Sequence, residues 1–431
     1  MSLLIQNVIA ALPKDGGGYE QMKTDVYITD GKIAAIGTAP AGAPADEVLD
    51  GGGKLLIPGL VNSHTHAYMT IFRNYADDLK FHDWLFGKIL PLEDKLSVED
   101  CRWGALLAMM EMLRSGTTCF LDMYPITEVY AEALKDSGMR AVLGRGLTGG
   151  ADDPGGGARR LAEAKTEIAR WSGTERLSFM LAPHAPYSCD PGYQREIAAL
   201  AAELDMGIHT HIAESRREVE EIHEKYGCTP VEMMDQSGLI GPRTVAAHCV
   251  HLTQSDIAIL AERGASVATN PVSNLKLANG IAPVPDLLAA GVNVAIGTDG
   301  AASNNSLNMI REMGYAALLH KGVTGDPEAV TASEALTMAT ANGAKALGLA
   351  SEIGKLEVGM RADLTLVDLS APNMQPVNSP IASLCYSAWG GEVSAVMVDG
   401  RILYRDGAFL TIDRERVLYE VEKVCEKIGM R

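Results

Sequence analysis

The feature that most constrains this chain is an alternation of short apolar runs with amphipathic segments, from residue 58 to about residue 350. Eight apolar runs can be counted, and each has the length of a buried strand, while the segments between them are long enough for helices. Eight strand–helix units with buried strands predict an α/β fold, a closed parallel (β/α)8 TIM barrel rather than an open sheet. The runs lie at residues 58–63, 117–123, 141–146, 177–183, 207–212, 244–249, 265–270 and 292–298.

Two of the intervening segments carry clear helix start and stop signals. The stretch "SVED", Ser97 to Asp100, is a capping-box pattern ahead of "CRWGALLAMMEMLRSG", which ends at Gly116. The stretch "DPGYQREIAALAAELDMG" begins with Asp190 as a capping residue and ends at Gly207. These signals predict one helix between Ser97 and Gly116 and another between Asp190 and Gly207.

The two ends of the chain are β-rich instead. The stretches "LLIQNVIAAL", "DVYITDGKIAAIG", "ADLTLVDL" and "VSAVMVDGRILYRDG" alternate apolar and polar residues, and Asp-Gly pairs at 30–31 and 399–400 are hairpin signals. Neither end can bury a core alone. We therefore predict a small composite β-sandwich domain formed by residues 1–57 and 355–431, with the barrel, residues 58–354, inserted between its halves.

Composition and charge exclude several functions. A net charge of −18 leaves no basic face for a nucleic-acid polymer. Apolar residues make up 47% of the chain without an uninterrupted run of about 18, so no membrane span is expected. The start of the chain lacks a basic segment followed by an apolar one, and the seven scattered cysteines form no Cys-x-x-Cys pair. These observations predict a cytoplasmic protein with reduced thiols.

Polar side chains gather at the ends of the predicted strands. His64 and His66 follow the first strand, His211 ends the fifth and Asp299 follows the eighth. The carboxyl ends of barrel strands meet at one face, where active sites form, and residues two apart on a strand project to the same side. Three or four nitrogen and oxygen ligands suit a catalytic zinc ion, although Fe²⁺ or Mn²⁺ accepts the same set. These four residues therefore predict a metal site.

Three further residues have roles that the spacing leaves open. His209 shares a strand face with His211, but only His211 has a carboxylate, Glu214, three residues later, so we interpret His209 as a lining residue rather than a ligand. Glu214 is either a surface acid or the free carboxylate that proton transfer beside a metal-bound water requires. His248 in "AAHCVH" is a fifth ligand, a packed core histidine or a partner of that water.

Four motifs resemble those of one protein family. The stretches "PGLVNSHTH", "HIAES", "AAHCVH" and "NPVSNLKL" through "GTDGAASNNSLN" are similar to the amidohydrolase superfamily, in the branch that deaminates cytosine, guanine and adenosine-like compounds. The similarity extends over nearly the whole chain, including "GKLEVGMRADLTLVDL", and is strongest to 5-methylthioadenosine/S-adenosylhomocysteine deaminases. It implies hydrolytic deamination of a small adenine nucleoside, with release of ammonia, by a homo-oligomeric enzyme.

The resemblance also implies the metal chemistry. Residues matching His64, His66, His211 and Asp299 bind one divalent ion per subunit, usually zinc, in that family. Residues matching Glu214 and His248 handle protons and orient the water, with Asp299 assisting. The fourth apolar run ends in "LAPHAPY" without a lysine that could be carboxylated, which favours one metal ion over a bridged pair.

Substrate contacts follow from the same resemblance. Trp84 and Glu93 lie in "ADDLKFHDWLFGKILPLEDKL", which resembles the lid of the family, and His184 matches a residue that contacts the purine. A carboxylate such as Glu93 can accept hydrogen bonds from both ribose hydroxyls. Arg145 and Arg160 match the arginines that pair with the amino-acid carboxylate of S-adenosylhomocysteine.

These contacts have alternatives. Trp84 is also consistent with ordinary packing, and Arg160 with a helix-surface charge. Arg159 is an equally good match in "GGGARRLAE", because the preceding glycine-rich stretch "TGGADDPGGGA" blurs the alignment. That stretch lacks the strand and helix context of a nucleotide-binding loop, so we interpret it as a mobile loop.

Other functions compete with adenine-nucleoside deamination. A guanine, 8-oxoguanine or other aminoheterocycle deaminase would use the same metal site, and so would a triazine hydrolase, although the retained "WLFGKILPLE" pattern argues against the latter. A non-catalytic scaffold is an alternative of another class. The presence of every ligand and of both proton-handling residues argues against it.

Overall fold

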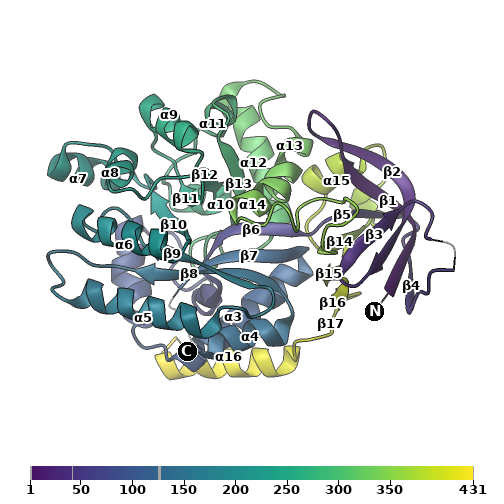
Figure 1. The fold of residues 1–431 in the computed structure, drawn as a ribbon, viewed down its shortest axis with the longest axis horizontal. Coiled ribbons are helices and arrows are strands. Elements are labelled where there is room, and N and C mark those ends of the chain that lie inside the picture. Colours follow the sequence, from purple (N-terminus) through teal and green to yellow (C-terminus); the bar gives the residue numbers. More distant parts are fainter. Residues whose placement is uncertain (1, 41, 125–127, 431) are drawn as a thin grey trace.

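The computed structural model describes residues 2–40, 42–124 and 128–430. Its central element is an eight-stranded sheet of parallel neighbours in the order β6-β7-β8-β9-β10-β11-β12-β13, which curls into a barrel (Figure 1). The predicted TIM barrel is confirmed. The strands are β6 (Leu60–Thr65), β7 (Thr117–Met123), β8 (Arg140–Leu147), β9 (Leu177–Pro183), β10 (Gly207–Ile212), β11 (Thr244–His248), β12 (Ser266–Thr269) and β13 (Asn293–Ile296).

The first and last strands close the barrel through bonds just beyond β13. The backbone N–H groups of Thr298 and Asp299 donate to the carbonyl oxygen of His64 at 3.1 and 3.0 Å. The side-chain oxygen of Asn62 accepts from the Thr298 N–H at 3.0 Å. Closure therefore places His64, which lies inside β6 rather than after it, directly beside Asp299.

Helices cover the outside of the barrel, and two begin as the sequence predicts. The Ser97 hydroxyl accepts from the Asp100 N–H while the Asp100 carboxylate accepts from the Ser97 N–H, and the Asp190 carboxylate accepts from the Tyr193 N–H. The helices of this layer are α3 (Val98–Arg114), α4 (Glu128–Ser137), α5 (Gly156–Trp171), α6 (Pro191–Glu203), α7 (Arg216–Tyr226), α8 (Pro230–Gln236), α9 (Gln254–Arg263), α10 (Pro271–Lys276), α11 (Val284–Ala289), α12 (Met309–Thr324), α13 (Ala332–Met338) and α14 (Ala341–Ala346).

Short helical turns follow β6 and cover the carboxyl end of the barrel. The short turns are η1 (Ala67–Phe72), α1 (Phe81–Trp84), η2 (Leu85–Ile89) and α2 (Leu90–Glu93).

Within the described residues, no helix combines the length and the apolar character that crossing a bilayer requires.

Both chain ends contribute to a second, mixed sheet, at the right of Figure 1. Its order is β17-β16-β15-β14-β5-β1-β2-β3, with β4 beside β1. Both predicted Asp-Gly turns are present: φ is 51° and 75° at Asp30 and Gly31, and 48° and 71° at Asp399 and Gly400, which are the positive values such hairpins need. The strands are β1 (Ser2–Pro13), β2 (Tyr19–Thr29), β3 (Lys32–Ile36), β4 (Glu47–Asp50), β5 (Lys54–Pro58), β14 (Leu364–Asp368), β15 (Val393–Val398), β16 (Arg401–Arg405) and β17 (Ala408–Phe409).

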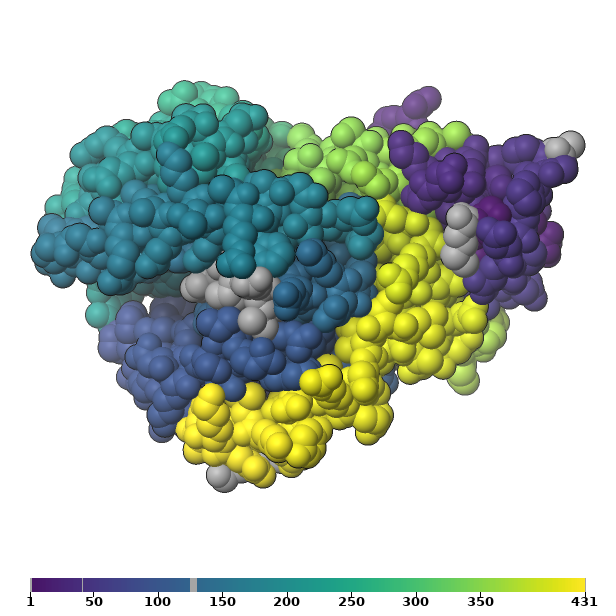
Figure 2. Space-filling view, turned by 60° about the horizontal axis from the view of Figure 1, so that its bottom comes forward, coloured from purple at the N-terminus to yellow at the C-terminus, as the bar shows by residue number. Residues whose placement is uncertain are grey.

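A buried ion network joins the two sheets. The guanidinium of Arg140, at the start of β8, donates to Asp363 and to Asp399, each at 2.8 Å. The C-terminal residues, yellow in Figure 2, run from beside the purple N-terminal strands to the blue part of the barrel. There α16 packs against α3. The remaining elements are η3 (Pro372–Met374), α15 (Pro380–Tyr386) and α16 (Arg414–Ile428).

Candidate metal centre and active site

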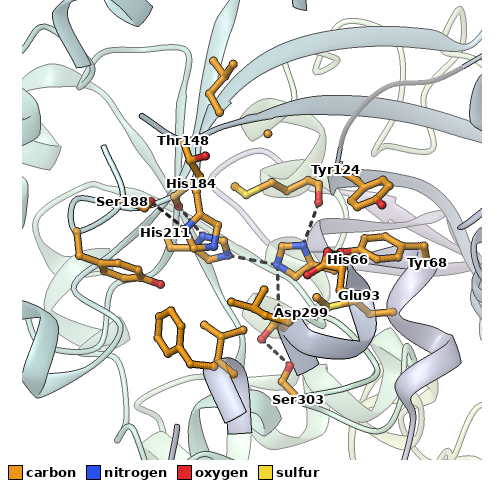
Figure 3. A pocket seen from close by; sticks show the side chains of 18 of the residues that line it. His66, Tyr68, Glu93, Tyr124, Thr148, His184, Ser188, His211, Asp299 and Ser303 are labelled. Atoms are coloured by element: carbon orange, nitrogen blue, oxygen red, sulfur yellow. Dashed lines mark hydrogen bonds and ion pairs between the residues drawn. The ribbon is translucent and has the colours of Figure 1, made fainter. Parts of the chain in front are cut away.

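The four residues predicted as ligands meet at the carboxyl end of the barrel, and Figure 3 shows three of them, His66, His211 and Asp299. One ligand atom from each of His64, His66 and Asp299 lies within 4.8 Å of the others, and the same holds for His64, His211 and His248. His66 Nε2 lies 3.3 Å from His211 Nε2 and 3.5 Å from Asp299 Oδ1. His64 belongs to both groups, so the four predicted ligands lie close together and His248 is near enough to be a fifth.

Hydrogen bonds orient the imidazoles toward this point. His66 Nδ1 donates to the carbonyl oxygen of Met123 at 3.1 Å, and His211 Nδ1 donates to that of His184 at 2.6 Å. Because a carbonyl only accepts, both Nε2 atoms keep a free lone pair when the rings are neutral. His64 Nε2 is buried and has no hydrogen-bond partner among the described residues, although Asp299 Oδ1 lies 3.4 Å away. This donor set fits a bound cation.

Burial keeps several of these imidazoles neutral. It lowers the pKa of His64 to about 3 and the pKa values of His209 and His211 well below their usual range. Neutral imidazole is the form that binds metal ions. His209 Nε2 lies 2.8 Å from His64 Nδ1, so His209 contacts a candidate ligand from the side away from the shared point.

Asp299 is held by three donors. The hydroxyls of Ser273 and Ser303 donate to its Oδ2 at 2.6 and 2.7 Å, and the Gly300 N–H donates to its Oδ1 at 2.8 Å. Burial acts to raise the pKa of Asp299, but the close approach of His64 at 3.4 Å, together with the nearby His248 and His66, outweighs it and holds the pKa well below its usual range. Asp299 therefore supplies a negative charge beside the imidazoles.

Glu214 is a buried residue on the loop after β10, and its carboxyl group lies beside this cluster. Its Oε1 accepts from the Asn279 side-chain amide at 3.0 Å, and its Oε2 lies 3.8 Å from His248 Nε2. Burial, with the negative charge of Asp299 adding to it, raises the pKa of Glu214 to about 8. A carboxyl group with a pKa near neutrality can both take up and release a proton at pH 7.

The backbone at these strand ends is unusual. Ala213, His248 and Asp299 have φ of 50°, 69° and 60°, which residues other than glycine seldom adopt. Such backbone strain concentrates at functional sites, where the surrounding structure enforces it. His248 is further fixed by the 2.8 Å contact between its Nδ1 and Asn274 Oδ1, which directs Nε2 toward Glu214.

A cavity of about 900 Å³ opens above the cluster and contains the residues predicted to contact substrate. The Tyr68 hydroxyl donates to Glu93 inside it, and burial lowers the pKa of His184 to about 4. Both Arg159 and Arg160 line the cavity, so the choice between them stays open. The predicted contacts that line it are Trp84, Glu93, Arg145, Arg160 and His184.

Several residues of the site were missed by sequence reasoning. Tyr68, two residues after His66, contacts Glu93, and alternation along "HTHAYMT" could have pointed to it. Glu218 accepts from the backbone N–H groups of Ala213 and Glu214 at 2.8 and 3.0 Å and so fixes the loop that carries Glu214. The Ser-x-x-Glu capping pattern in "SRRE" was the available signal.

The acids that pair with the cavity arginines were also missed. Arg145 contacts Glu163 at 3.2 Å and Glu167 at 3.1 Å, and Arg160 pairs with Asp153. The sequence offered only a weak signal, the four-residue spacing of acids along the helix. Neither Arg145 nor Arg160 is therefore an isolated positive charge.

Comparison with known proteins identifies the class. Residues 55–403 match the model of the amidohydrolase family, so the chain belongs to that family, as its motifs predicted. More particularly, the chain is 47% identical to the 5-methylthioadenosine/S-adenosylhomocysteine deaminase of Desulforudis audaxviator, and the match covers 99% of each chain.

Solved structures agree with this placement. An adenosine deaminase from Xanthomonas campestris with bound zinc has a TM-score of 0.93 and 35% identity, covering 100% of this chain and 99% of the other. The atrazine chlorohydrolase of Arthrobacter aurescens TC1, complexed with zinc, has a TM-score of 0.91 and 26% identity, covering 98% of this chain and 99% of the other.

Proposed function

We propose that the chain is a metal-dependent deaminase of adenine nucleosides. Its substrates are 5′-methylthioadenosine, S-adenosylhomocysteine or both, with adenosine and 5′-deoxyadenosine as further candidates. The observation that carries the proposal is the buried Glu214 carboxyl group beside a cluster of histidines and Asp299, at the floor of a cavity of about 900 Å³. The name of the relative from Desulforudis audaxviator, at 47% identity, supports the substrate class.

His64, His66, His211 and Asp299 would hold one divalent cation. Zinc is the first candidate, since the relative from Xanthomonas campestris carries it, and Fe²⁺ or Mn²⁺ suits the same ligands. A bound divalent cation lowers the pKa of water and thereby makes it a nucleophile at neutral pH.

The chain's own residues would position the water and move its protons. The reaction breaks the bond between the adenine ring carbon and its amino nitrogen and forms a bond from that carbon to the water oxygen. His248 and Asp299 would orient the water. Glu214 would accept a proton from it and deliver it to the adjacent ring nitrogen, and transfer of the second proton to the amino group lets it leave as ammonia. Each such transfer contributes about 10²–10⁴-fold.

Residues that line the cavity would determine the substrate specificity. Glu93, the last residue of α2, would accept hydrogen bonds from both ribose hydroxyls, and Trp84 would pack against the nucleoside. His184 would contact the purine. Arg145 and Arg160, or Arg159 in its place, would face the group carried on the 5′ carbon.

A substrate panel tests this function. Metal-loaded protein should shift the absorbance of methylthioadenosine or S-adenosylhomocysteine from adenosine-like to inosine-like and release one ammonia per nucleoside. Turnover of guanine or 8-oxoguanine alone would overturn the role of Glu93. Turnover of a chlorotriazine alone would favour the hydrolase that the chain resembles at a TM-score of 0.91. Protein that binds no metal and acts on nothing would favour a scaffold.

A further inference from the structure

The arginines of the cavity wall formed by the end of β8, the loop after it and α5 are each paired with carboxylates. Arg145 is nearly buried, with 6% of its side chain exposed, and its Nη2 and Nε lie 3.2 and 3.1 Å from Glu163 and Glu167. Its Nη1 donates to the carbonyl oxygen of Gly146 at 2.6 Å. Two carboxylates therefore compensate one guanidinium before any substrate enters.

The other two arginines of this wall are also paired. Arg159 Nε lies 3.5 Å from Glu163 Oε1, and Arg160 pairs with Asp153 while donating to the carbonyl oxygen of Thr148 at 3.0 Å. Counting Asp153 and Glu167, which do not line the cavity themselves, three carboxylates pair with the three arginines. A subsite for a purely anionic group, such as a 5′-phosphate, needs uncompensated positive charge, which this wall lacks.

Glu163 differs from the other two acids. Of these three carboxylates it alone lines the cavity, between Arg145 and Arg159, and 46% of its side chain is exposed. Its two oxygens face different arginines, Oε2 toward Arg145 and Oε1 toward Arg159. An α-amino acid carries an ammonium and a carboxylate on one carbon atom. Alternating guanidinium and carboxylate groups therefore match both charges of that zwitterion.

We propose that Glu163 is a specificity-determining residue that binds the α-ammonium group of S-adenosylhomocysteine, while Arg145 and one of its neighbouring arginines bind the carboxylate. The subsite thereby selects a zwitterionic 5′ substituent over an anionic one. This inference rests on the proposed deaminase function. It assigns to Glu163 no part in the chemical step.

Three substrates that differ in the charges on the 5′ substituent test this inference. Methylthioadenosine has an uncharged 5′ substituent, S-adenosylhomocysteine has both charges, and 5′-S-(3-carboxypropyl)-5′-thioadenosine has the carboxylate without the ammonium. The metal-loaded full chain is compared with Glu163→Gln, which keeps the side-chain shape. Glu167→Gln is the matched control, since it removes the other carboxylate on Arg145 without changing the cavity lining.

Glu163→Gln should lower kcat/KM for S-adenosylhomocysteine about tenfold, the loss expected for a hydrogen bond to a charged group, and leave methylthioadenosine within about twofold. The carboxypropyl compound should be unchanged or improved, because Arg145 loses a competing carboxylate. Glu167→Gln should not produce the selective loss.

Each other result overturns the inference. An equal loss for all three substrates would mean that Glu163 is only structural. A gain for S-adenosylhomocysteine would mean that Glu163 merely competes with substrate for Arg145. Turnover of methylthioadenosine but not of S-adenosylhomocysteine by the unmodified enzyme would refute the subsite and leave the deaminase function standing. Turnover of no adenine nucleoside would refute both.

Discussion

Replacing Glu214 with glutamine isolates its proton-transfer role. Glu214 is 6% exposed, and its Oε1 accepts from Asn279 at 3.0 Å, a bond that the glutamine oxygen can keep. Shape and packing are therefore preserved, while the group that we propose takes and delivers the proton is lost. General acid–base catalysis contributes about 10²–10⁴-fold, equivalent to about 3–5 kcal/mol of barrier, so kcat should fall by at least about 100-fold with KM little changed.

The same substitution should not destabilise the metal-free protein. Burial raises the pKa of Glu214 to about 8 from its ordinary 4.5, so ionisation is disfavoured in the folded state. Stability is then lost as pH rises through 4.5, where the unfolded chain ionises, until the folded-state group ionises near pH 8. Each pH unit costs about 1.4 kcal/mol, so at pH 7 the penalty is on the order of 3 kcal/mol. Glutamine removes this penalty.

Two assays check these expectations. Steady-state kinetics on methylthioadenosine measures kcat, and thermal unfolding of chelator-treated protein at pH 4 and pH 8 measures the stability difference, which should be near zero at pH 4 and favour the variant at pH 8. Glu221→Gln, which removes the exposed ion pair with Arg217, is a matched control. A Glu214→Gln variant that keeps more than a tenth of the activity would refute the reasoning.

Three further predictions concern the metal, the ribose and the link between the sheets. His211→Ala should lower the bound zinc, measured by elemental analysis, well below one equivalent, and unchanged zinc would contradict its place among the ligands. Glu93→Gln should raise KM for nucleosides about tenfold with kcat nearly constant, and an equal KM would exclude the ribose contact. Arg140→Met leaves Asp363 buried without its partner and should cost about 3–5 kcal/mol in denaturant unfolding, whereas a loss below about 1 kcal/mol would show that the network adds little.

Local chemistry made most of the fold predictable. The Asp-Gly hairpins and the Ser97 capping box depend on a few adjacent residues, and the barrel follows from the repeated strand length. The start of the first strand was not predictable, because the apolar run 58–63 is shared by two sheets. Pro58 ends β5, and β6 begins at Leu60. Apolar periodicity does not record which sheet a residue joins.

In the candidate site, too, some contacts could be predicted from the sequence and others could not. The clustering of His64, His211 and Asp299 could be predicted, because the carboxyl ends of parallel barrel strands meet at one face. The pairing of Arg145 with Glu163 could not, since it depends on how α5 is rotated against β8. For that reason the arginines were predicted as anion-binding groups, whereas the structure shows them in a charge-balanced wall.

The central claim is that one divalent ion on this cluster supports deamination of an adenine nucleoside. Zinc titration of chelator-treated protein, with ammonia release from methylthioadenosine as the readout, tests it most directly. We expect the rate to rise linearly and to reach a plateau at one zinc per chain. A plateau at two equivalents, or a rate that does not depend on the metal, would contradict the account.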